Sequence, residues 1–450
     1  MATETLSRIT GTEMEYCIFV RRLGGESFFP QEGSLLNHAQ LAAMLPAGIV
    51  TLDTYLSNGG RCYQDVGPHT EYDTPEIASS LVDTVTSEIA GERIVHAILE
   101  SVKAKKQIAD YRLNKRLVDN QGTTCGHHEN YSCGTDGITI DKEHLTLLGL
   151  HLATRNVWAG AGCLLPQNNR NVFYLSQKIG SLEYDYASST TNQSKPLVNL
   201  RNQQLADKSR FVRVHVTSGD ANMSPWAMWM SLGTTSIVLR LIENSIDIGD
   251  LATQLDVLSL AKAVNTDPNM TRLYDLTDER RVTAIDIQSM LVDLAYKHAD
   301  EMMLPEEEAR VLREWERVLF DLDIEPLSTI DRVEWIARRQ LILGHCNKKH
   351  RSCNDERLLD LDKMWDEISP RGIALNKLRT GLWSAWMPDQ AAIERAITTP
   401  PQNTRAAVRG RFVEKFAGRK GYGVTEWERL DMGNRCIMIS DPRVSTTQEF

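Results

Sequence analysis

Hydrophobic and polar residues follow two different periods along this chain. In the first half, Ile9 to Val20 and Gly60 to Val66 have the pattern of strands, while Ser79 to Lys105 carries apolar residues at helical spacing. After about residue 250 the pattern becomes mostly helical. The chain is therefore expected to combine a mixed first part with a helical second part.

Further elements follow from the same periods and from turn and capping residues. Strands are predicted at residues 9–20, 60–66, 110–118, 123–132, 171–175 and 211–217, with 110–118 and 123–132 forming a hairpin around residues 119–122. Helices are predicted at residues 35–45, 79–105, 141–158, 284–302, 306–321 and 330–344, and from the N-cap Ser224 to about Asn244. Strands followed by a run of helices predict an α+β fold, an antiparallel sheet backed by helices.

The C-terminal region is set apart by the Pro400-Pro401 pair. The residues from about Asp389 onward are long enough to form a small attached module. We therefore expect a large domain over residues 1–385 and a small C-terminal domain over residues 386–450.

Composition narrows the class of protein. Of the 450 residues, 42% are hydrophobic and 24% are charged, which excludes a disordered or fibrous protein. The net charge of −10 argues against non-specific nucleic-acid binding. The N-terminus has no signal-peptide pattern, and the longest apolar stretch, residues 41–52, is too short to span a bilayer. We expect a cytoplasmic protein with eight reduced cysteines and neither nucleic-acid nor membrane partners.

The sequence GTEMEY, Gly11 to Tyr16, is the strongest local signal for chemistry. Side chains alternate between the faces of a strand, so Glu13 and Glu15 point the same way. Two neighbouring carboxylates repel each other unless a cation lies between them, and oxygen ligands of this kind suit Mg²⁺. The alternative is the solvated polar face of an edge strand.

A second cluster lies between Asn58 and Glu76. Arg61, Tyr63 and Asp65 share one strand face, and Glu71 and Thr74 follow a Gly-Pro turn. Arginine pairs with phosphate, glutamate binds metals, and aspartate can act as a base. So many ionisable groups fit a solvated active cleft better than a core, although an ordinary solvated strand and loop is the alternative.

The third and fourth clusters also lie on predicted strands. In CGHHENY, alternation places His127 and Glu129 on one face and His128 with Asn130 on the other. A zinc site is disfavoured because the spacing fits no closed pattern of the four possible ligands, Cys125, His127, His128 and Cys133. In the fourth cluster, Arg213 and His215 share a face, and the polar turn at 219–222 offers backbone N–H groups to an anion.

The remaining features of the sequence do not indicate catalytic residues. The GxxxxGK[ST], GxGxxG and GxSxG motifs are absent from the sequence, which disfavours P-loop, Rossmann and α/β-hydrolase enzymes. The tryptophans and methionines of residues 226–230 are interpreted as core residues. The region around His345, Cys346, His350 and Cys353 is interpreted as a solvated loop, with a metal site as the alternative.

Taken in order, these clusters resemble the Pup ligase and Pup deamidase (depupylase) family, a branch of the glutamine-synthetase-like carboxylate–amine ligases. The resembling segments are GTEMEY, NGGRCYQDVGPHTEYDTPE, CGHHENY, ASSTTNQSKPLVNLR, RVHVTSGDANMS and PPQNTRAAVRGRF, which span nearly the whole chain. The resemblance implies a glutamine-synthetase-like fold, in which a curved antiparallel sheet forms a cradle for ATP and Mg²⁺, with a small C-terminal domain. It also implies two partners, a disordered Pup-like modifier and a lysine-bearing protein.

The resemblance further implies individual roles. It implies magnesium ligation by Glu13, Tyr63 and Glu71, with Glu15, His128 and His215 as further polar positions of the cleft and candidates for a second metal. It implies nucleotide contacts for Arg61, Thr74 and Trp427, with Arg213 adding to the phosphoryl clamp, and a catalytic base at Asp65.

Two chemistries are known in this family, ligation of the modifier and hydrolysis of its amide linkages. Deamidases carry a long loop before the second strand, and the 45 or so residues between Glu15 and Arg61 are too few to hold one. We therefore expect the ligase, with the deamidase as the alternative. Asn192 and Lys195 stand where ligases usually carry Arg, so a related tag or a small-molecule carboxylate is a further alternative substrate. A catalytically silent scaffold is the remaining alternative.

Overall fold

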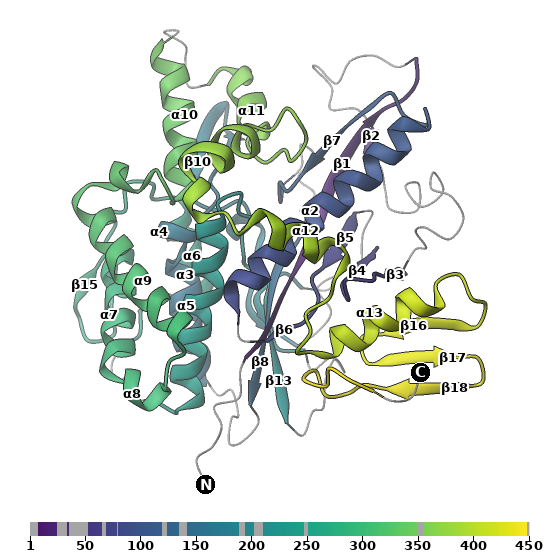
Figure 1. Ribbon diagram of the computed structural model, residues 1–450. Helices are drawn as coiled ribbons and strands as arrows, with labels where there is room; N and C mark the ends of the chain where they lie inside the picture. Colours follow the sequence, from purple (N-terminus) through teal and green to yellow (C-terminus); the bar gives the residue numbers. More distant parts are fainter. Residues whose placement is uncertain are drawn as a thin grey trace.

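The structure is a computed structural model. It describes residues 8–24, 34–35, 53–64, 69–78, 80–118, 124–134, 142–188, 194–201, 210–246, 251–348, 354–447 and 450. Within these residues a large sheet has the strand order β11-β12-β13-β8-β1-β5-β4-β3, and β2, β6 and β7 also pair with β1 (Figure 1). The long strand β1 therefore organises the sheet.

The strands of the large sheet are β1 (Ile9–Arg21), β2 (Ser34–Leu35), β3 (Asp53–Tyr55), β4 (Arg61–Tyr63), β5 (Thr70–Asp73), β6 (Ile77–Ala78), β7 (Asp110–Asn114), β8 (His127–Gly134), β11 (Tyr184–Ala187), β12 (Pro196–Asn199) and β13 (Phe211–Val216). Two short ribbons are formed by β9 (Cys163–Gln167) with β10 (Arg170–Tyr174), and by β14 (Tyr274–Asp275) with β15 (Arg281–Val282). All pairs in the large sheet are antiparallel except β11 with β12.

The α-helices before the C-terminal region are α2 (Leu81–Ala104), α3 (Lys142–Thr154), α4 (Asn156–Ala159), α5 (Pro225–Glu243), α6 (Val257–Asn265), α7 (Ala284–Lys297), α8 (Ala299–Met302), α9 (Glu306–Ile324), α10 (Glu334–Lys348) and α11 (Glu356–Lys363). Short 3₁₀ segments lie at Ile179–Ser181, Pro326–Thr329 and Ser384–Trp386, and a π-helix at Ala374–Leu382. Together with the sheet they form the predicted α+β architecture, a sheet backed by helices.

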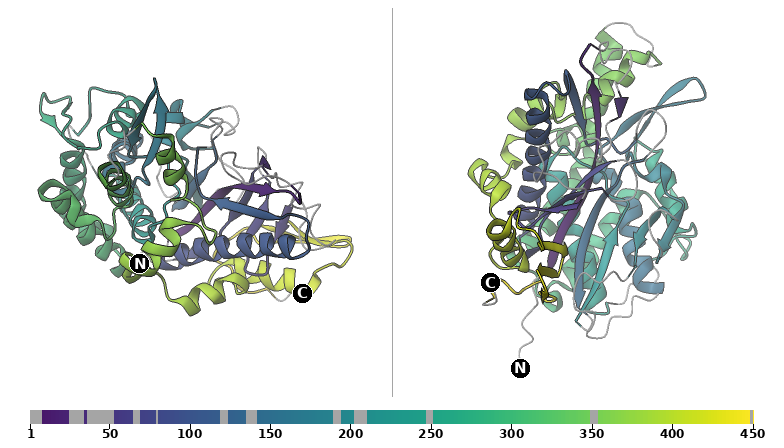
Figure 2. Two further views of the ribbon diagram at one scale, coloured as in Figure 1. Left: turned by 90° about the horizontal axis from the view of Figure 1, so that it is seen from above. Right: turned by 90° about the vertical axis from the view of Figure 1, so that its right-hand side faces the viewer.

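Helix α2 covers one face of the sheet and lies between it and α12 (Gln390–Thr398) (Figure 2). The close approach depends on Gly91, where a Cβ atom would come within 2.2 Å of the Tyr72 ring. Met14 and Tyr16 of β1 belong to the same buried cluster as Tyr72. The opposite side chains of β1, which include Glu13 and Glu15, therefore point away from α2.

Helix α5 lies at the centre of the larger hydrophobic core. Its residues from Pro225 to Ile242 are all buried, and it contacts α2, α3 and α9. A helix that is buried on every side needs other elements around it and partners for its polar groups, and Arg240 of α5 accordingly pairs with Glu308 of α9. The interpretation of the tryptophans and methionines at 226–230 as core residues is confirmed, as is the N-cap Ser224, whose side chain accepts from Ala227 N.

The C-terminal region contains α13 (Arg405–Phe416) and a three-stranded sheet of β16 (Tyr422–Glu426), β17 (Arg429–Met432) and β18 (Arg435–Met438). Its apolar side chains form a separate cluster that includes Val408, Phe412 and Leu430. We call α13 and this sheet the C-terminal module. The expected domain boundary at residue 385 stays a prediction.

Most predicted elements are confirmed within a few residues, but the hairpin is wrong. The strands at 110–114 and 127–134 each pair antiparallel with β1, so they run in the same direction and cannot form a hairpin with each other. An isolated bridge between Val118 and Thr124 is all that joins the flanks of that turn in the described chain. The predicted helix at 35–45 begins at Leu35, which is in β2, and the rest of it lies outside the described residues.

Within the described ranges, no helix is both long and apolar enough to cross a membrane.

Candidate active site

The register of the central strands places the predicted residues on one face of the sheet. Directly opposed residues of neighbouring strands share a face. Glu13 lies opposite Asp73 of β5 and His128 of β8, and Asp73 lies opposite Arg61 of β4. We call Arg61, Asp73, Glu13 and His128 the first row.

A second row follows two residues further along β1. Glu15 lies opposite Glu71, which in turn lies opposite Tyr63. Glu71 is only 1% exposed. We call Tyr63, Glu71 and Glu15 the second row. Because side chains alternate along a strand, these side chains lie on the same face of the sheet as the first row. Three glutamates therefore meet on one face: strand alternation predicts this for Glu13 and Glu15, and the register of β5 adds Glu71.

Glu13 is the centre of a cluster that β8 and β13 complete. Its Oε2 lies 3.0 Å from His128 Nδ1 and 3.2 Å from His215 Nε2. Its Oε1 accepts hydrogen bonds from Arg213 Nη2 at 2.8 Å and from Asn130 Nδ2 at 3.0 Å. Burial alone would raise the pKa of Glu13, but these basic neighbours lower it well below its usual range. Glu13 is therefore a carboxylate at neutral pH.

The two histidines beside Glu13 stand edge to face. The ring centroids of His128 and His215 are 4.8 Å apart. Burial and the nearby Arg213 lower the pKa of His215 to about 3, so its ring is neutral. Glu13, His128 and His215 offer three ligand atoms within 4.8 Å of one another. Two imidazoles and a carboxylate at this spacing could hold a cation.

Glu15 is held by a different histidine. Its Oε2 lies 3.4 Å from His69 Nδ1. Burial would raise the pKa of Glu15, but His69, His128 and Lys178 lower it. Glu15 is therefore ionised as well, and the face carries a concentration of negative charge that basic groups surround.

Trp427 reaches this face from the C-terminal module, where it lies between β16 and β17. Its ring contacts Tyr55 edge-on, with centroids 5.4 Å apart, and the Arg409 guanidinium lies 4.5 Å from its centroid. Arg409 Nη1 also donates to the Trp427 carbonyl at 2.9 Å. Arg409 and Arg405 both pair with Glu76, just after β5. These contacts attach the C-terminal module to the large sheet and hold Trp427.

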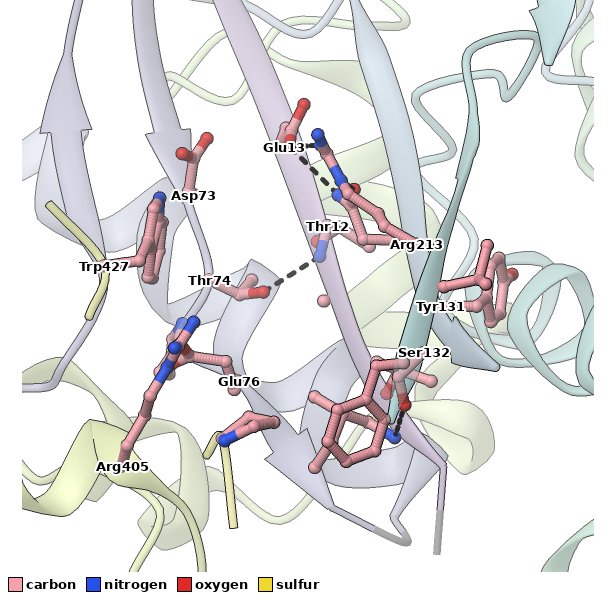
Figure 3. A pocket seen from close by; sticks show the side chains of 18 residues that line it. Thr12, Glu13, Asp73, Thr74, Glu76, Tyr131, Ser132, Arg213, Arg405 and Trp427 are labelled. Carbon is pink, nitrogen blue, oxygen red and sulfur yellow. Dashed lines mark hydrogen bonds and ion pairs between the residues drawn. The ribbon is translucent and has the colours of Figure 1, made fainter. Parts of the chain in front are cut away.

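A cavity of about 120 Å³, partly open to solvent, lies between the first row and the C-terminal module. Figure 3 shows Trp427 and Arg405 on one side of it and Arg213 on the other. Four predicted residues line it: Glu13, Thr74, Arg213 and Trp427. Thr74 Oγ1 accepts a hydrogen bond from Thr12 N at 2.9 Å, which joins this wall to β1. The cavity therefore joins β1, the segment after β5, β13 and the C-terminal module.

The remaining predicted residues extend from the cavity across the sheet. Arg61 lies over the Tyr63 ring, with its guanidinium 3.9 Å from the ring centroid. Arg61, Tyr63, Glu15, Glu71 and His215 share the face of the two rows without lining the cavity itself. The predicted base Asp65 lies outside the described residues, so its role stays a prediction.

The structure also tests the two sets of cysteines and histidines that the sequence analysis considered as metal sites. His127 points to the opposite face from His128 and lies 3.2 Å from Glu88 Oε2 of α2, while Cys133 contacts Arg8. The set Cys125, His127, His128 and Cys133 is therefore wrong as a metal site, because strand alternation separates its members. Of the second set, Cys346 is buried in a small hydrophobic cluster, and residues 350 and 353 lie outside the described residues.

Some residues of this site were not predicted. Asp73 follows Glu71 by two positions, so strand alternation could have found it. The Arg409–Glu76 pair joins residues 333 positions apart, and no local pattern signals such a contact.

Comparisons with known proteins give consistent results. The sequence model of a family described as "Pup-ligase protein" matches residues 8–431. The chain is 31% identical to the Pup--protein ligase of Acidimicrobium ferrooxidans, over 97% of this chain and 96% of that protein, and 31% identical to that of Kribbella flavida with the same coverage.

Two solved structures resemble the fold. A crystal structure of the complex between the prokaryotic ubiquitin-like protein Pup and its ligase PafA matches with a TM-score of 0.84 and 27% identity, covering 99% of this chain and 92% of that one. A structure of the Pup ligase PafA in complex with ADP matches with a TM-score of 0.77 and 28% identity, covering 89% of each chain.

Proposed function

Because this chain belongs to the Pup-ligase family, we propose that it is an ATP-dependent ligase that joins a Pup-like modifier to protein lysines. The bond formed is an isopeptide between the side-chain carboxylate of the modifier's C-terminal glutamate and a lysine amine. Relatives named for this activity match nearly the whole chain. The observation that carries the proposal is the ionised Glu13 cluster beside a cavity that Trp427 borders.

The cavity between the first row and the C-terminal module is assigned to the nucleotide. Trp427 and Thr74 line it, and an aromatic ring with apolar neighbours suits a nucleobase. Arg213 lies at the inner end beside Glu13, and Arg61 lies on the same face, where both could pair with phosphates. The similar Pup ligase PafA has been solved in complex with ADP.

The two rows fit a hard divalent cation. Glu13, Glu71 and Tyr63 supply oxygen atoms, the ligands that Mg²⁺ prefers, and Glu15 and His215 flank them. Opposed carboxylates such as Glu15 and Glu71 destabilise a sheet unless positive charge compensates them. We assign Mg²⁺ to Glu13, Tyr63 and Glu71, where the bound ion would offset the negative charge of the nucleotide phosphates.

The chemistry follows from the poor reactivity of a carboxylate. The γ-phosphoryl group of ATP passes to a carboxylate oxygen, which gives an acyl phosphate and ADP. The lysine nitrogen then attacks the acyl carbon, the carbon–oxygen bond to phosphate breaks, and inorganic phosphate leaves. Arg61 and Arg213 stabilise charge on the transferring group, and Asp65 takes the proton from the lysine, which is not nucleophilic while protonated.

The test is intact-mass spectrometry of a reaction that contains the protein, ATP, Mg²⁺, a Glu-terminated Pup-like tag and a lysine-bearing acceptor protein. The proposal predicts a product equal to tag plus acceptor minus one water, with equimolar ADP. A matched reaction with a Gln-terminated tag should give no conjugate. Loss of ammonia from that Gln-terminated tag, with no conjugate from the Glu form, would overturn the proposal in favour of the deamidase.

A further inference from the structure

Two cysteines and a histidine meet on the same sheet face, beyond the second row and two residues further along β1. Cys17 follows Glu15 by two residues on β1 and therefore points to the same side. His69 directly precedes Thr70, which lies opposite Tyr16, so His69 comes next to Cys17. Cys125, just before β8, places its Sγ 2.6 Å from Cys17 Sγ.

The three side chains are buried and close enough to share one ligand. A ring nitrogen of His69 and the two sulfurs lie within 4.8 Å of one another. Cys17, Cys125 and His69 are 2%, 0% and 5% exposed. His69 Nδ1 faces Glu15 Oε2 at 3.4 Å, whereas Nε2 is buried and has no hydrogen-bond partner among the described residues. A buried polar nitrogen in this state costs stability unless something binds it.

We propose that Cys17, Cys125 and His69 form a binding site for Zn²⁺. Thiolates and imidazole are the ligands that zinc prefers, whereas Mg²⁺ prefers oxygen ligands, so this site differs in chemistry from the carboxylate rows beside it. Two cysteines and one histidine with a fourth position open to water form a known type of zinc ligand set. The site does not depend on the proposed ligase activity.

Glu15 supports this assignment. A histidine that binds zinc through one ring nitrogen usually donates a hydrogen bond from the other nitrogen to a carboxylate, which fixes the ring orientation. Glu15 Oε2 lies 3.4 Å from Nδ1 of His69, where it can take this role, and Nε2 is left for a ligand. Glu15 then acts as a positioning residue for the zinc site, and the assignment of Mg²⁺ to Glu13, Tyr63 and Glu71 is unchanged.

The Cys17–Cys125 distance alone does not distinguish a bound cation from a disulfide, and His69 is needed to choose between them. Two thiolates bonded to one zinc at 2.3 Å lie about 3.8 Å apart in tetrahedral geometry, so zinc would separate this pair by about 1 Å. A disulfide would need a smaller movement in the opposite direction, but it would leave Nε2 of His69 without a partner. His69 as a third ligand therefore favours a bound cation over a disulfide, and the experiment also tests for the disulfide.

A zinc ion at this position would join three segments that carry the active face. Cys17 is on the strand of Glu13, His69 precedes the strand of Glu71, and Cys125 precedes the strand of His128. A ligand that binds only the folded state stabilises that state by RT ln(1 + [L]/Kd), and it therefore raises the unfolding temperature. Removal of zinc should therefore lower the unfolding temperature of the full-length protein.

The experiment measures metal content and the cobalt spectrum of the full-length protein. The protein is purified from zinc-supplemented medium, desalted and analysed for zinc by mass spectrometry. We expect about one zinc per chain, and in a Co²⁺-substituted sample a thiolate-to-cobalt charge-transfer band, as two thiolate ligands require. Cys17→Ser and Cys125→Ser should lose both signals, and Glu15→Gln should weaken zinc binding by about 10- to 100-fold.

Cys163→Ser is the matched control, because Cys163 is also fully buried but belongs to no cluster of possible ligands in the described chain. It should keep the zinc and the cobalt band. If both serine variants fail to fold, the wild-type cobalt spectrum still decides the assignment. A wild-type protein without metal, a mass two hydrogens lower from a disulfide, or zinc retained by both serine variants at Glu13, His128 and His215 would overturn the proposal.

Discussion

Replacing Arg409 with Met should weaken the attachment of the C-terminal module to the sheet. Arg409 is fully buried, pairs with Glu76 and donates to the carbonyls of Gly59 and Trp427. Without it, Arg405 is the one charged partner that Glu76 keeps among the described residues. A buried carboxylate that loses a partner is strongly destabilising, so we expect the variant to be less stable and to bind nucleotide more weakly through misplacement of Trp427.

The pKa of Glu76 gives the magnitude. Burial would raise this pKa, but Arg409 and Arg405 lower it from 4.5 to about 2. Such a difference corresponds to about 3 kcal/mol in favour of the ionised carboxylate. Breaking a buried ion pair typically costs 3 to 5 kcal/mol, which agrees in order of magnitude.

A double-mutant cycle measures this interaction. The variants are Arg409→Met, Glu76→Gln and their combination, and the free energy of unfolding comes from urea titration followed by circular dichroism. The coupling between Arg409 and Glu76 should lie toward the upper end of the roughly 0.5 to 3 kcal/mol measured for residues in contact, because Arg405 shares part of the effect on Glu76. The exposed pair Arg429–Asp431, also in the C-terminal module and 3.0 Å long, is the matched control and should show little coupling.

The pH dependence provides an independent check. Because the pKa of Glu76 is lower in the folded protein than its ordinary 4.5, the pair contributes its full stability above about pH 4.5. That contribution is lost as the pH falls toward 2. The wild type should therefore lose more stability than Glu76→Gln across this window. Equal losses, or a coupling near zero at neutral pH, would refute the reasoning.

Three further predictions concern the active face and the core. Asp65→Asn should keep the fold and ATP binding but lose conjugation, and conjugation at a near wild-type rate would remove its assignment as the base. Glu13→Ala should lose Mg²⁺-dependent ATP binding in calorimetry, whereas unchanged affinity at saturating Mg²⁺ would count against its role. Arg338→Met should lower the free energy of unfolding by at least about 3 kcal/mol, because Asp362 and Asp366 are fully buried and both pair with Arg338. An unchanged urea midpoint would contradict the last prediction.

The arrangement of the active face could be predicted because it depends on strand alternation. Glu13, Glu15, Arg61 and Tyr63 each share a face with a neighbour two positions away, and the register brings these pairs together. The period of two is visible in the sequence, so the face of each residue follows from it. Which strands become neighbours is not a local property, and for that the resemblance of the six segments was needed.

The failed hairpin has a physical reason. Residues 119–122 have turn-forming chemistry, but the flanking strands both pair with β1, whose 13 residues offer enough length for two partners end to end. Tertiary pairing therefore overrides a local turn signal. The approach of Cys17 to Cys125 arises in the same way, since the chain leaves the edge of β1 after Asn114 and returns to it before His127.

The attachment of the C-terminal module could not be predicted from local patterns. Glu76 lies 333 positions before Arg409 in the sequence, and their contact depends on how the hydrophobic cluster of the C-terminal module packs beside the large sheet. The resemblance implies a nucleotide contact for Trp427. The structure adds the arginine that holds it.

The central claim, activation of a carboxylate by ATP, is tested most directly by isotope transfer. A Pup-like tag labelled with ¹⁸O in both oxygens of its C-terminal side-chain carboxylate is conjugated to a lysine-bearing acceptor in the presence of ATP and Mg²⁺. An acyl phosphate intermediate requires one ¹⁸O atom to appear in each inorganic phosphate and the other to remain in the isopeptide bond. Unlabelled phosphate alongside a conjugate would contradict the account.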